Sequence, residues 1–513
     1  MSSLFPAGGQ RGTTVEVFAG GKFPNWPAQA WVDRPGLTIS PASDKGKLSV
    51  AIAPDAAPGL YWIRLHDAEG AAPPQPFVVG TLPEFVETES NNAPHKAQAT
   101  PSSTVVANGR LAVGGDVDHF AVSLAKGQTL VASLAGHETL GSPMDAVMHV
   151  VLPAGGQLAY NHDQRGLDPE IIFTAPADGN YLVRVFGFPS TPGSSIAFAG
   201  GDRYLYRLTL TTAGFVDYAW PLAVTRDRET RVELEGWNIP ESLRVITIKP
   251  EGERFEIADP QLANTAVVAV EPHDTLVESE PNEPASPQAI ALPVTMTGRI
   301  GRPGDVDAFS FDGKQGQPLV FQLESRALGY PLDAVLEATD GAGKSLARVD
   351  DVTSARDPFL TFSPPADGSF RVLVSDLNRQ GSSRQVYRLR ARPAKPSYEV
   401  TADTHAYIAT PDKPAEITLS VDRQNGFAEE IGFTVTGLPD SIAAAQVTST
   451  ASGDSAKAVK LSLTTRGGPF SGPIRIHAEA NGASKLTRTA TTAIPNHTAR
   501  TALLWLTATA AKK

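Results

Sequence analysis

Four short motifs occur twice in this chain, in the same order and at nearly constant spacing. Their first copies lie at residues 87–91, 115–120, 140–147 and 176–179, and their second copies at 278–282, 304–309, 328–335 and 365–368. Self-similarity of this kind means that one structural unit is built more than once along the chain. The two copies are therefore expected to share one fold.

A fainter repeat precedes each copy, because residues 11–17 resemble residues 228–234. The order of units is thus A, B, A′, B′ and a tail. A chain of 513 residues is also far longer than a single hydrophobic core supports, so several domains are required. We place the units at residues 1–82 (A), 83–213 (B), 214–274 (A′), 275–393 (B′) and 394–513 (tail).

Hydrophobic residues alternate with polar ones in many segments, as at Tyr181, Val183 and Val185. A period of two indicates strands with one buried face. Turn sequences such as Ala-Asp-Gly at 177–179 and 366–368 separate these runs, and no long run keeps the helical period without Pro or Gly. Nearly all regular structure should therefore be strand, arranged as five sandwich modules in line.

The B units resemble bacterial pre-peptidase C-terminal (PPC) domains through three motifs that agree in both copies. These are the acidic openings at 87–91 and 278–282, the Gly-Asp-Val-Asp segments at 115–118 and 304–307, and the Ala-Asp-Gly turns. The resemblance implies a jelly-roll-like β-sandwich of the kind attached to secreted hydrolases, often peptidases, where it assists localisation or substrate binding.

The A units resemble the immunoglobulin-like IPT/TIG modules, and the tail resembles a further immunoglobulin-type module. Pattern and resemblance together predict an all-β protein. Its architecture is expected to be tandem β-sandwich modules, immunoglobulin-like and jelly-roll-like, in a linear multi-domain array.

Calcium is the one cofactor that the residues suggest, since hard cations prefer several oxygen ligands. In an extended segment Glu278, Glu280 and Asn282 project to one side. Asp305 and Asp307 do the same on the following strand, so the two sets can meet around one ion.

Some PPC domains resemble this arrangement and bind calcium with the acidic opening and a nearby Asp pair. Carried over by motif position, that resemblance gives the candidate metal ligands Glu278, Glu280, Asn282, Glu283, Asp305 and Asp307 in B′, and Glu87, Glu89, Asn91, Asn92, Asp116 and Asp118 in B.

The first copy departs from the PPC pattern, with Ser90 in place of the usual Pro and Asn92 in place of an acid. Its lower charge predicts a weaker site. A simpler alternative applies to both copies. Glu-x-Glu is then a solvated linker between modules, and Asp-Val-Asp fixes a turn through hydrogen bonds from side chain to backbone.

Catalysis requires a nucleophile, a base and a group that orients the base, and the sequence offers no persuasive set. It contains no His-Glu-x-x-His, Gly-x-Ser-x-Gly or Gly-x-x-x-x-Gly-Lys motif, and its ten histidines are scattered singly. The chain has no cysteine, which excludes cysteine nucleophiles, disulfides and thiolate metal sites. We therefore expect no enzymatic activity.

The chain has 55 acidic and 44 basic residues, a formal charge of −11, and no Lys/Arg cluster. Nucleic acid and anionic membranes are therefore poor partners, and no apolar run is long enough for insertion into a membrane. We expect a monomer whose partner is an unknown extracellular protein or polysaccharide. Tryptophans such as Trp62 and Trp237 either belong to the sandwich cores or mark a binding face.

These observations predict a non-catalytic bacterial protein outside the cytoplasm, whether secreted, periplasmic or on the cell surface, although residues 1–6 show no export signal. Its expected role is binding, adhesion or spacing, with calcium stabilisation. The alternative is the accessory part of a secreted hydrolase or peptidase system, which the fold resemblance supports only by association. A third alternative, a hydrolase with an unrecognised site, would need a pocket with convergent titratable groups.

Overall fold

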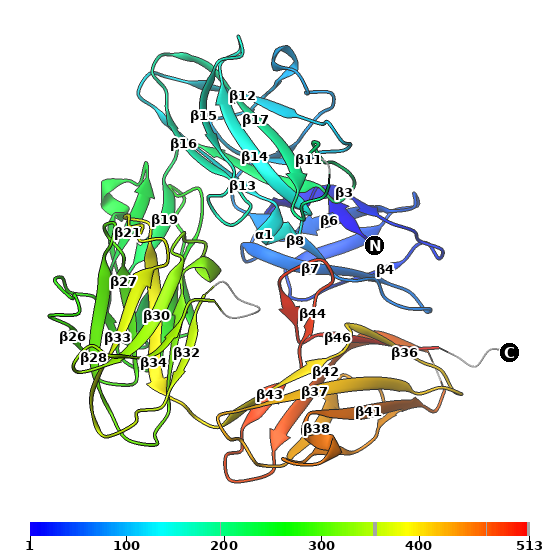
Figure 1. Ribbon diagram of the computed structural model, residues 1–513. Coiled ribbons are helices and arrows are strands. Elements are labelled where there is room, and N and C mark those ends of the chain that lie inside the picture. Colours follow the sequence, from blue (N-terminus) through cyan, green and yellow to red (C-terminus); the bar gives the residue numbers. More distant parts are fainter. Residues whose placement is uncertain (195, 352–356, 468, 510–513) are drawn as a thin grey trace.

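The computed structural model describes residues 1–194, 196–351, 357–467 and 469–509. Strands dominate it, and the single α-helix among these residues is one turn long, α1 (His137–Leu140). The strands form pairs of packed sheets, so the predicted all-β fold of tandem β-sandwiches is confirmed (Figure 1). No helix in this described part of the chain is long and apolar enough to cross a membrane.

Modules B and B′ have the same architecture. The sheets of B have the strand orders β10-β12-β17-β14-β15 and β16-β13-β18-β11-β9. Those of B′ have the orders β26-β28-β33-β30-β31 and β32-β29-β34-β27-β25, so every strand of B has a counterpart in B′. The repeated motifs of the sequence therefore correspond to one repeated fold.

Their element bounds are as follows. Module B contains β9 (Glu84–Val86), η1 (Pro94–Lys96), β10 (Gln98–Ala99), β11 (Thr104–Arg110), β12 (Asp118–Leu124), β13 (Thr129–Ala135), α1, β14 (Met144–Val151), β15 (Gln157–Asn161), β16 (Glu170–Thr174), β17 (Gly179–Pro189) and β18 (Leu205–Thr211). Module B′ contains β25 (Thr275–Val277), β26 (Gln288–Ala289), β27 (Val294–Arg299), β28 (Val306–Gly313), β29 (Leu319–Glu324), η3 (Arg326–Leu328), β30 (Ala334–Asp340), β31 (Ser345–Val349), β32 (Phe359–Phe362), β33 (Gly368–Asp376) and β34 (Val386–Pro393).

Module A is a sandwich of two four-stranded sheets, and module A′ is a smaller one of two three-stranded sheets. Module A contains β1 (Ser3–Phe5), β2 (Gly8–Gln10), β3 (Thr14–Gly20), β4 (Gln29–Val32), β5 (Leu37–Pro41), β6 (Lys47–Ile52), β7 (Gly59–His66) and β8 (Gln75–Gly80). Module A′ contains β19 (Phe215–Trp220), β20 (Ala223–Thr225), β21 (Thr230–Trp237), η2 (Glu241–Leu243), β22 (Val245–Ile248), β23 (Arg254–Ile257) and β24 (Ala266–Glu271).

The tail is a fifth sandwich with sheets β35-β37-β41-β39 and β36-β46-β42-β38-β40, and a small hairpin, β44-β45, extends from it. Its elements are β35 (Ser397–Ala402), β36 (Ala406–Ala409), β37 (Ala415–Gln424), β38 (Ile431–Thr436), β39 (Ile442–Ala444), β40 (Val447–Ser449), η4 (Asp454–Ala456), β41 (Ala458–Thr465), β42 (Phe470–Ala480), β43 (Thr487–Thr489), β44 (Thr492–Ala493), β45 (Arg500–Thr501) and β46 (Leu504–Ala508).

Alternation along the strands produces a separate core in each sandwich. Val183 and Val185 of β17 are fully buried in the core of B, and Val372 and Val374 of β33 have the same place in B′. The residues between them project from the opposite face of the sheet. The period of two in the sequence therefore decides which side chains lie inside each module.

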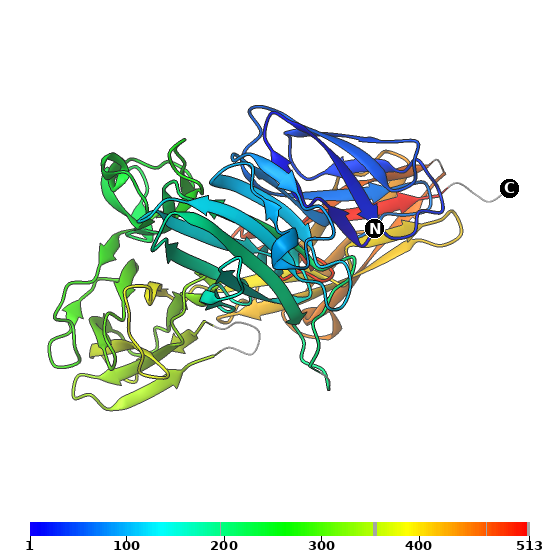
Figure 2. The ribbon, with the colours of Figure 1, turned by 90° about the horizontal axis from the view of Figure 1, so that it is seen from above.

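The modules follow one another as a linear array along the chain, but in space the array bends back on itself. Figure 1 shows the tail returning to lie beside module A, and Figure 2 shows the same two modules overlapping from above. The two tryptophans Trp31 of A and Trp505 of the tail pack edge to face at a centroid distance of 5.6 Å. Aromatic contacts therefore join the first module to the last. The prediction of five modules in a straight line did not include this contact.

Polar contacts accompany this closure. The Arg64 guanidinium of A donates to Nδ1 of His405 in the tail (3.1 Å), and Nδ1 of His66 lies 3.0 Å from Oγ of Ser471. Nε1 of Trp505 donates to the same Ser471 oxygen (3.0 Å). Arg64 is only 1% exposed, so a positive charge is buried where the first and last modules meet.

Several other tryptophans also lie at module junctions. Trp62 of A packs against His497 of the tail, and Trp237 of A′ belongs to an apolar cluster with Val131 of B. Both tryptophans are half-buried. These two tryptophans therefore lie neither in a sandwich core nor on a free binding face, the two alternatives left open by the sequence. They join modules instead.

Candidate metal centres

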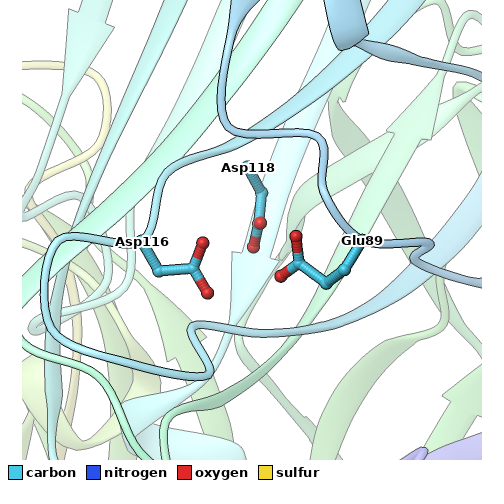
Figure 3. A group of neighbouring side chains, drawn as sticks. All are labelled: Glu89, Asp116 and Asp118. Carbon is cyan, nitrogen blue, oxygen red and sulfur yellow. The ribbon is translucent and has the colours of Figure 1, made fainter.

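Three carboxylates of module B converge beside the start of β12. Asp116 lies in the turn before the strand, Asp118 begins it, and Glu89 comes from the segment after β9 (Figure 3). One oxygen from each lies within 4.8 Å of the others. Asp116 and Asp118 are buried, whereas Glu89 is exposed at the rim.

Module B′ repeats this cluster with Glu280, Asp305 and Asp307, whose oxygens also lie within 4.8 Å of one another. Calcium binds oxygen at about 2.4 Å, so oxygens on opposite sides of one ion are about 4.8 Å apart. Of the two sets of residues predicted from the sequence, Glu280, Asp305 and Asp307 are therefore close enough to share an ion.

Backbone and tyrosine hydrogen bonds fix the aspartates. Asp116 accepts from the Ala112 N–H (2.6 Å), and Asp305 accepts from the N–H of Gly301 (2.9 Å). These bonds support the alternative interpretation of Asp-Val-Asp as a turn motif, but they use only part of each carboxylate. Oδ1 of Asp305 has no hydrogen-bond partner and is buried.

The inner aspartates each receive a hydrogen bond from a tyrosine. Tyr206 of β18 donates to Asp118, and Tyr387 of β34 donates to Asp307, both at 2.6 Å. Sequence analysis missed both tyrosines as site residues. A signal existed, because Tyr-Arg-Leu occurs at 206–208 and again at 387–389.

Glu87 and Glu278 lie behind the clusters. Burial, followed by the charge of Asp118, raises the pKa of Glu87, and burial with the charge of Asp307 raises the pKa of Glu278 in the same way. Burial is also the main reason that the pKa of Asp307 is raised. Ionising both carboxylates of such an adjacent pair is energetically unfavourable. The pairs Glu87/Asp118 and Glu278/Asp307 therefore each retain a proton unless a cation compensates the charge.

Each segment that supplies the exposed glutamate also contains a buried asparagine, Asn91 or Asn282. Asn91 is fully buried, and neither its amide oxygen nor its amide nitrogen has a partner. With its nitrogen turned towards them, Asn282 donates to Glu280 and Asp307 at 3.2 Å. With the amide turned over, its oxygen faces the same two carboxylates, as a cation ligand would.

Two predicted ligands lie outside the clusters. Asn92 donates to Asp116 (2.8 Å), and Glu283 forms an ion pair with Arg302 (2.9 Å). Arg302 also approaches Asp305 at 3.5 Å. The position of Arg302 is Val113 in the first copy, so the extra acid of the second copy is offset by an extra base. The charge difference that predicted a weaker first site is therefore smaller than the sequence indicates.

The donor set fits calcium. Every convergent atom is a carboxylate or amide oxygen, which are ligands for hard cations, and calcium takes six to eight of them. In module B, Oδ1 of Asp118 and the Asn91 amide have no partner, and in B′ Oδ1 of Asp305 has no hydrogen bond and meets only Arg302 at 3.5 Å, so both centres retain coordination capacity. Water can supply the remaining ligands of such an ion.

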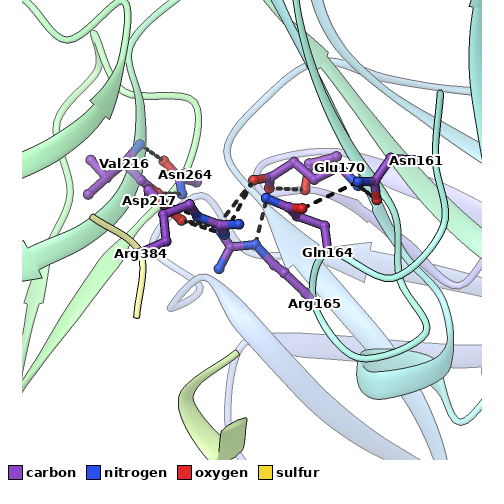
Figure 4. Close-up of polar contacts among 9 residues, drawn as sticks. Asn161, Gln164, Arg165, Glu170, Val216, Asp217, Asn264 and Arg384 are labelled. Carbon is purple, nitrogen blue, oxygen red and sulfur yellow. Dashed lines mark hydrogen bonds and ion pairs between the residues drawn. The ribbon is translucent and has the colours of Figure 1, made fainter. Parts of the chain in front are cut away.

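A second polar cluster, which sequence analysis did not predict, joins three modules (Figure 4). Asp217 of A′ accepts from Arg165 of B (2.7 Å) and from Nε of Arg384 of B′ (2.6 Å). Arg165 also donates to Glu170 of B at 3.1 Å. The Asp217 and Glu170 side chains are 4% and 1% exposed, so this joint is largely removed from water.

Comparison with known families places one match within module B. The model of the bacterial pre-peptidase C-terminal domain matches residues 116–187, which contain Asp116, Asp118, the strands from β12 to β16 and most of β17. A protein of Deinococcus radiodurans described as a probable subtilase-type serine protease is 38% identical over 212 residues. That alignment covers 40% of this chain, and the chain spans only 23% of the relative's length.

Among solved structures, the pre-peptidase C-terminal domain of a collagenase from Bacillus anthracis aligns over 22% of this chain and 94% of its own, with 17% identity and a TM-score of 0.17. SGBP-B of a mixed-linkage glucan utilization locus of Bacteroides ovatus, solved with a heptasaccharide, aligns over 75% of this chain and 73% of its own, with 11% identity and a TM-score of 0.13.

Proposed function

We propose that this chain is a non-catalytic, extracytoplasmic binding or spacer protein in which modules B and B′ are each stabilised by a calcium ion. One observation carries the proposal. A duplicated fold brings three acidic side chains together twice, and each segment that supplies the glutamate also carries a fully buried asparagine, Asn91 or Asn282. Burial of an unpaired carboxylate is energetically unfavourable, so a solvated acidic linker would not be expected to bury such groups.

Calcium would act here by compensating repulsion. Without an ion, the segments around 87–92 and 278–283 bring carboxylates against the buried pairs Glu87/Asp118 and Glu278/Asp307. With an ion, the same segments would be clamped onto their sandwiches. Each ion would therefore fix the connection between a PPC-like module and the module before it, which suits a spacer.

A large cleft between two modules supports a binding role better than a catalytic one. It measures about 1200 Å³ and lies between B and B′. Its buried aspartates are occupied: Asp168 accepts from the N–H groups of Gly136, His137 and Glu138. Asp357 accepts in the same way from the Ser325–Ala327 turn. Carboxylates held in this manner support the chain locally and are poor general bases.

A second candidate function is the accessory part of a secreted hydrolase system. The PPC match and the protease relative favour it, although the chain spans 23% of that relative. In this case the chain, or a longer protein that contains it, would position a hydrolase or its substrate. Both candidates place the protein outside the cytoplasm, where calcium is plentiful enough for sites of modest affinity.

Thermal unfolding with and without calcium tests the proposal. An ion that binds only the folded form at a hundredfold excess over Kd adds about 2.7 kcal/mol. Calcium should therefore raise the melting temperature of the full chain well above its value in EDTA. Glu280→Gln with Asp305→Asn, and Glu89→Gln with Asp116→Asn, should each remove part of this rise.

The matched control is Glu251→Gln with Glu253→Gln, which removes the same charge from two exposed positions. This variant should keep the full response. A wild-type melting curve that millimolar calcium does not change would refute calcium stabilisation and leave the acidic openings as linkers. An equal loss of response in the control variant would refute the assignment of these residues.

A further inference from the structure

The outer face of one sheet in module B carries a transverse row of basic and aromatic side chains. His119 of β12 is paired with Arg184 of β17, Arg184 with His149 of β14, and His149 with Tyr160 of β15. The residues on either side of Arg184 and His149 are core residues of the sandwich, so these side chains project outward. His119 lies on the same face but is only 2% exposed, because its Nδ1 contacts the Asn91 carbonyl oxygen (3.1 Å), so the accessible part of the row runs from Arg184 to Tyr160. Asp118, in contrast, points inward to Tyr206.

The second copy shows that the fold does not need this row. At the same registers B′ has Ala308, Leu373, Glu337 and Arg348. The strand order and the inner carboxylate clusters are the same in both modules. The side chains of the row therefore belong to module B in particular and are not explained by the shared architecture.

Arg184 is incompletely satisfied in its surroundings. One guanidinium nitrogen donates to Nδ1 of His149, and Nε is buried without a partner. Among the described residues no carboxylate forms an ion pair with it, and its guanidinium lies 5.5 Å from the Phe186 ring centre. Nε is closed off from solvent, so an anion would have to meet the terminal NH groups of this half-buried guanidinium, which has no carboxylate partner.

Tyr160 adds a flat apolar surface at the end of the row. It is 62% exposed, and its ring lies nearly parallel to that of His162, with centroids 6.5 Å apart. His162 is itself held by Asp163 at 2.7 Å. An exposed aromatic platform and a guanidinium without a carboxylate partner thus share one face, two strands apart, which is about 10 Å.

We propose that this face of module B binds an acidic polysaccharide, with an anionic group on Arg184 and a sugar ring on Tyr160. The guanidinium requires a carboxylate or sulfate, and the platform requires a ring with an apolar face. A span of about 10 Å between the two contacts favours neighbouring units of a chain over a single small anion.

Binding of polygalacturonate, measured by calorimetry in EDTA, tests the proposal independently of calcium. Fully methyl-esterified galacturonan is the matched ligand, since it has the same ring without the charge. Wild type should bind the acid at least about tenfold more tightly than the ester, because the charge-assisted bond is lost with the ester. Dextran sulfate is the second test ligand, because it carries sulfate groups instead of carboxylates on sugar rings.

Arg184→Gln and Tyr160→Ala should each weaken binding by about tenfold or more, whereas Arg184→Lys should retain part of it. Arg348→Gln is the matched control, because it removes one charge from an exposed position of the corresponding row in B′. Melting curves like that of wild type show that each variant is folded. Arg184-dependent binding of either polyanion supports the proposal, and binding of dextran sulfate alone identifies the anion as sulfate.

Four results would overturn it. These are measurable binding of acid and ester with equal affinity, unchanged affinity in Arg184→Gln, an equal loss in Arg348→Gln, and binding of neither polyanion. Equally tight binding of poly-glutamate would also overturn it, because that polymer supplies carboxylates without a sugar ring.

Discussion

Acidification should open the contact between the first and last modules. Arg64 can only donate, so its bond to Nδ1 of His405 requires that this nitrogen carry no proton. Burial, followed by the charge of Arg64, lowers the pKa of His405 to about 4. Burial also lowers the pKa of His66, against the opposing influence of Asp67. Protonation of either histidine would place a second positive charge beside buried Arg64.

The direction and the magnitude of this pH effect follow from the linkage between proton binding and closure of the contact. The closed form binds fewer protons than the open form, in which histidine has its usual pKa near 6.5. Stability of the contact is therefore complete above about pH 6.5 and is lost as the pH falls towards 4. For His405 the full shift amounts to about 3 kcal/mol, and about half of that after solvent screening. At pH 5 the ratio of closed to open forms should be about tenfold lower than at pH 8.

The absence of cysteine makes the assay direct. Fluorophores on Glu69→Cys in module A and Asp412→Cys in the tail, both exposed positions, report the separation of the two modules. Energy transfer should fall between pH 7 and pH 5 in wild type and much less in His405→Gln. His95→Gln, which removes an exposed histidine of module B, is the control and should behave like wild type. Constant transfer from pH 8 to pH 4.5, or an undiminished fall in His405→Gln, would refute the reasoning.

Two further predictions concern buried polar groups. Tyr387→Phe leaves the buried Asp307 without its hydroxyl donor and should lower the free energy of unfolding by about 1–3 kcal/mol without calcium, and by less with calcium. The control Tyr160→Phe, at an exposed position, should not change the free energy of unfolding measurably. Equal losses in the two variants would contradict the role given to Tyr387. Asp217→Ala leaves Arg165 and Arg384 facing each other without their shared carboxylate and should cost about 3 kcal/mol while changing the small-angle scattering profile. An unchanged profile would show that the joint does not fix the bend.

The sequence was sufficient to predict what local periodicity controls. Alternation in an extended segment predicted that Glu278, Glu280 and Asn282 project to one side towards Asp305 and Asp307, and the duplication predicted the same arrangement twice; Glu280, Asp305 and Asp307 and their counterparts do converge. Tyr387 lies 80 residues from Asp307, and only the pairing of distant strands brings them together. Motif spacing alone carries no information on such a partner.

Junctions between modules were beyond prediction for a related reason. Arg165, Asp217 and Arg384 come from three modules, and each looks like an ordinary surface charge in its own segment. Their meeting depends on how complete sandwiches pack as rigid bodies. The return of the tail to module A has the same origin, since Trp31 and Trp505 lie at opposite ends of the chain.

The duplication separates two kinds of constraint within one fold. The inward-facing groups Asp118 and Asp307, each with its tyrosine, agree between the copies, because a buried carboxylate tolerates no change that removes its partner. The outward-facing row is free of that restriction, and there Arg184 and His149 of B correspond to Leu373 and Glu337 of B′. Packing explains why the buried residues agree between the two copies, but it does not explain why the residues on the outer face differ. A polysaccharide ligand of module B is therefore more reasonably sought on the outer face, where the copies differ, than at the carboxylate centres that they share and that we propose hold calcium.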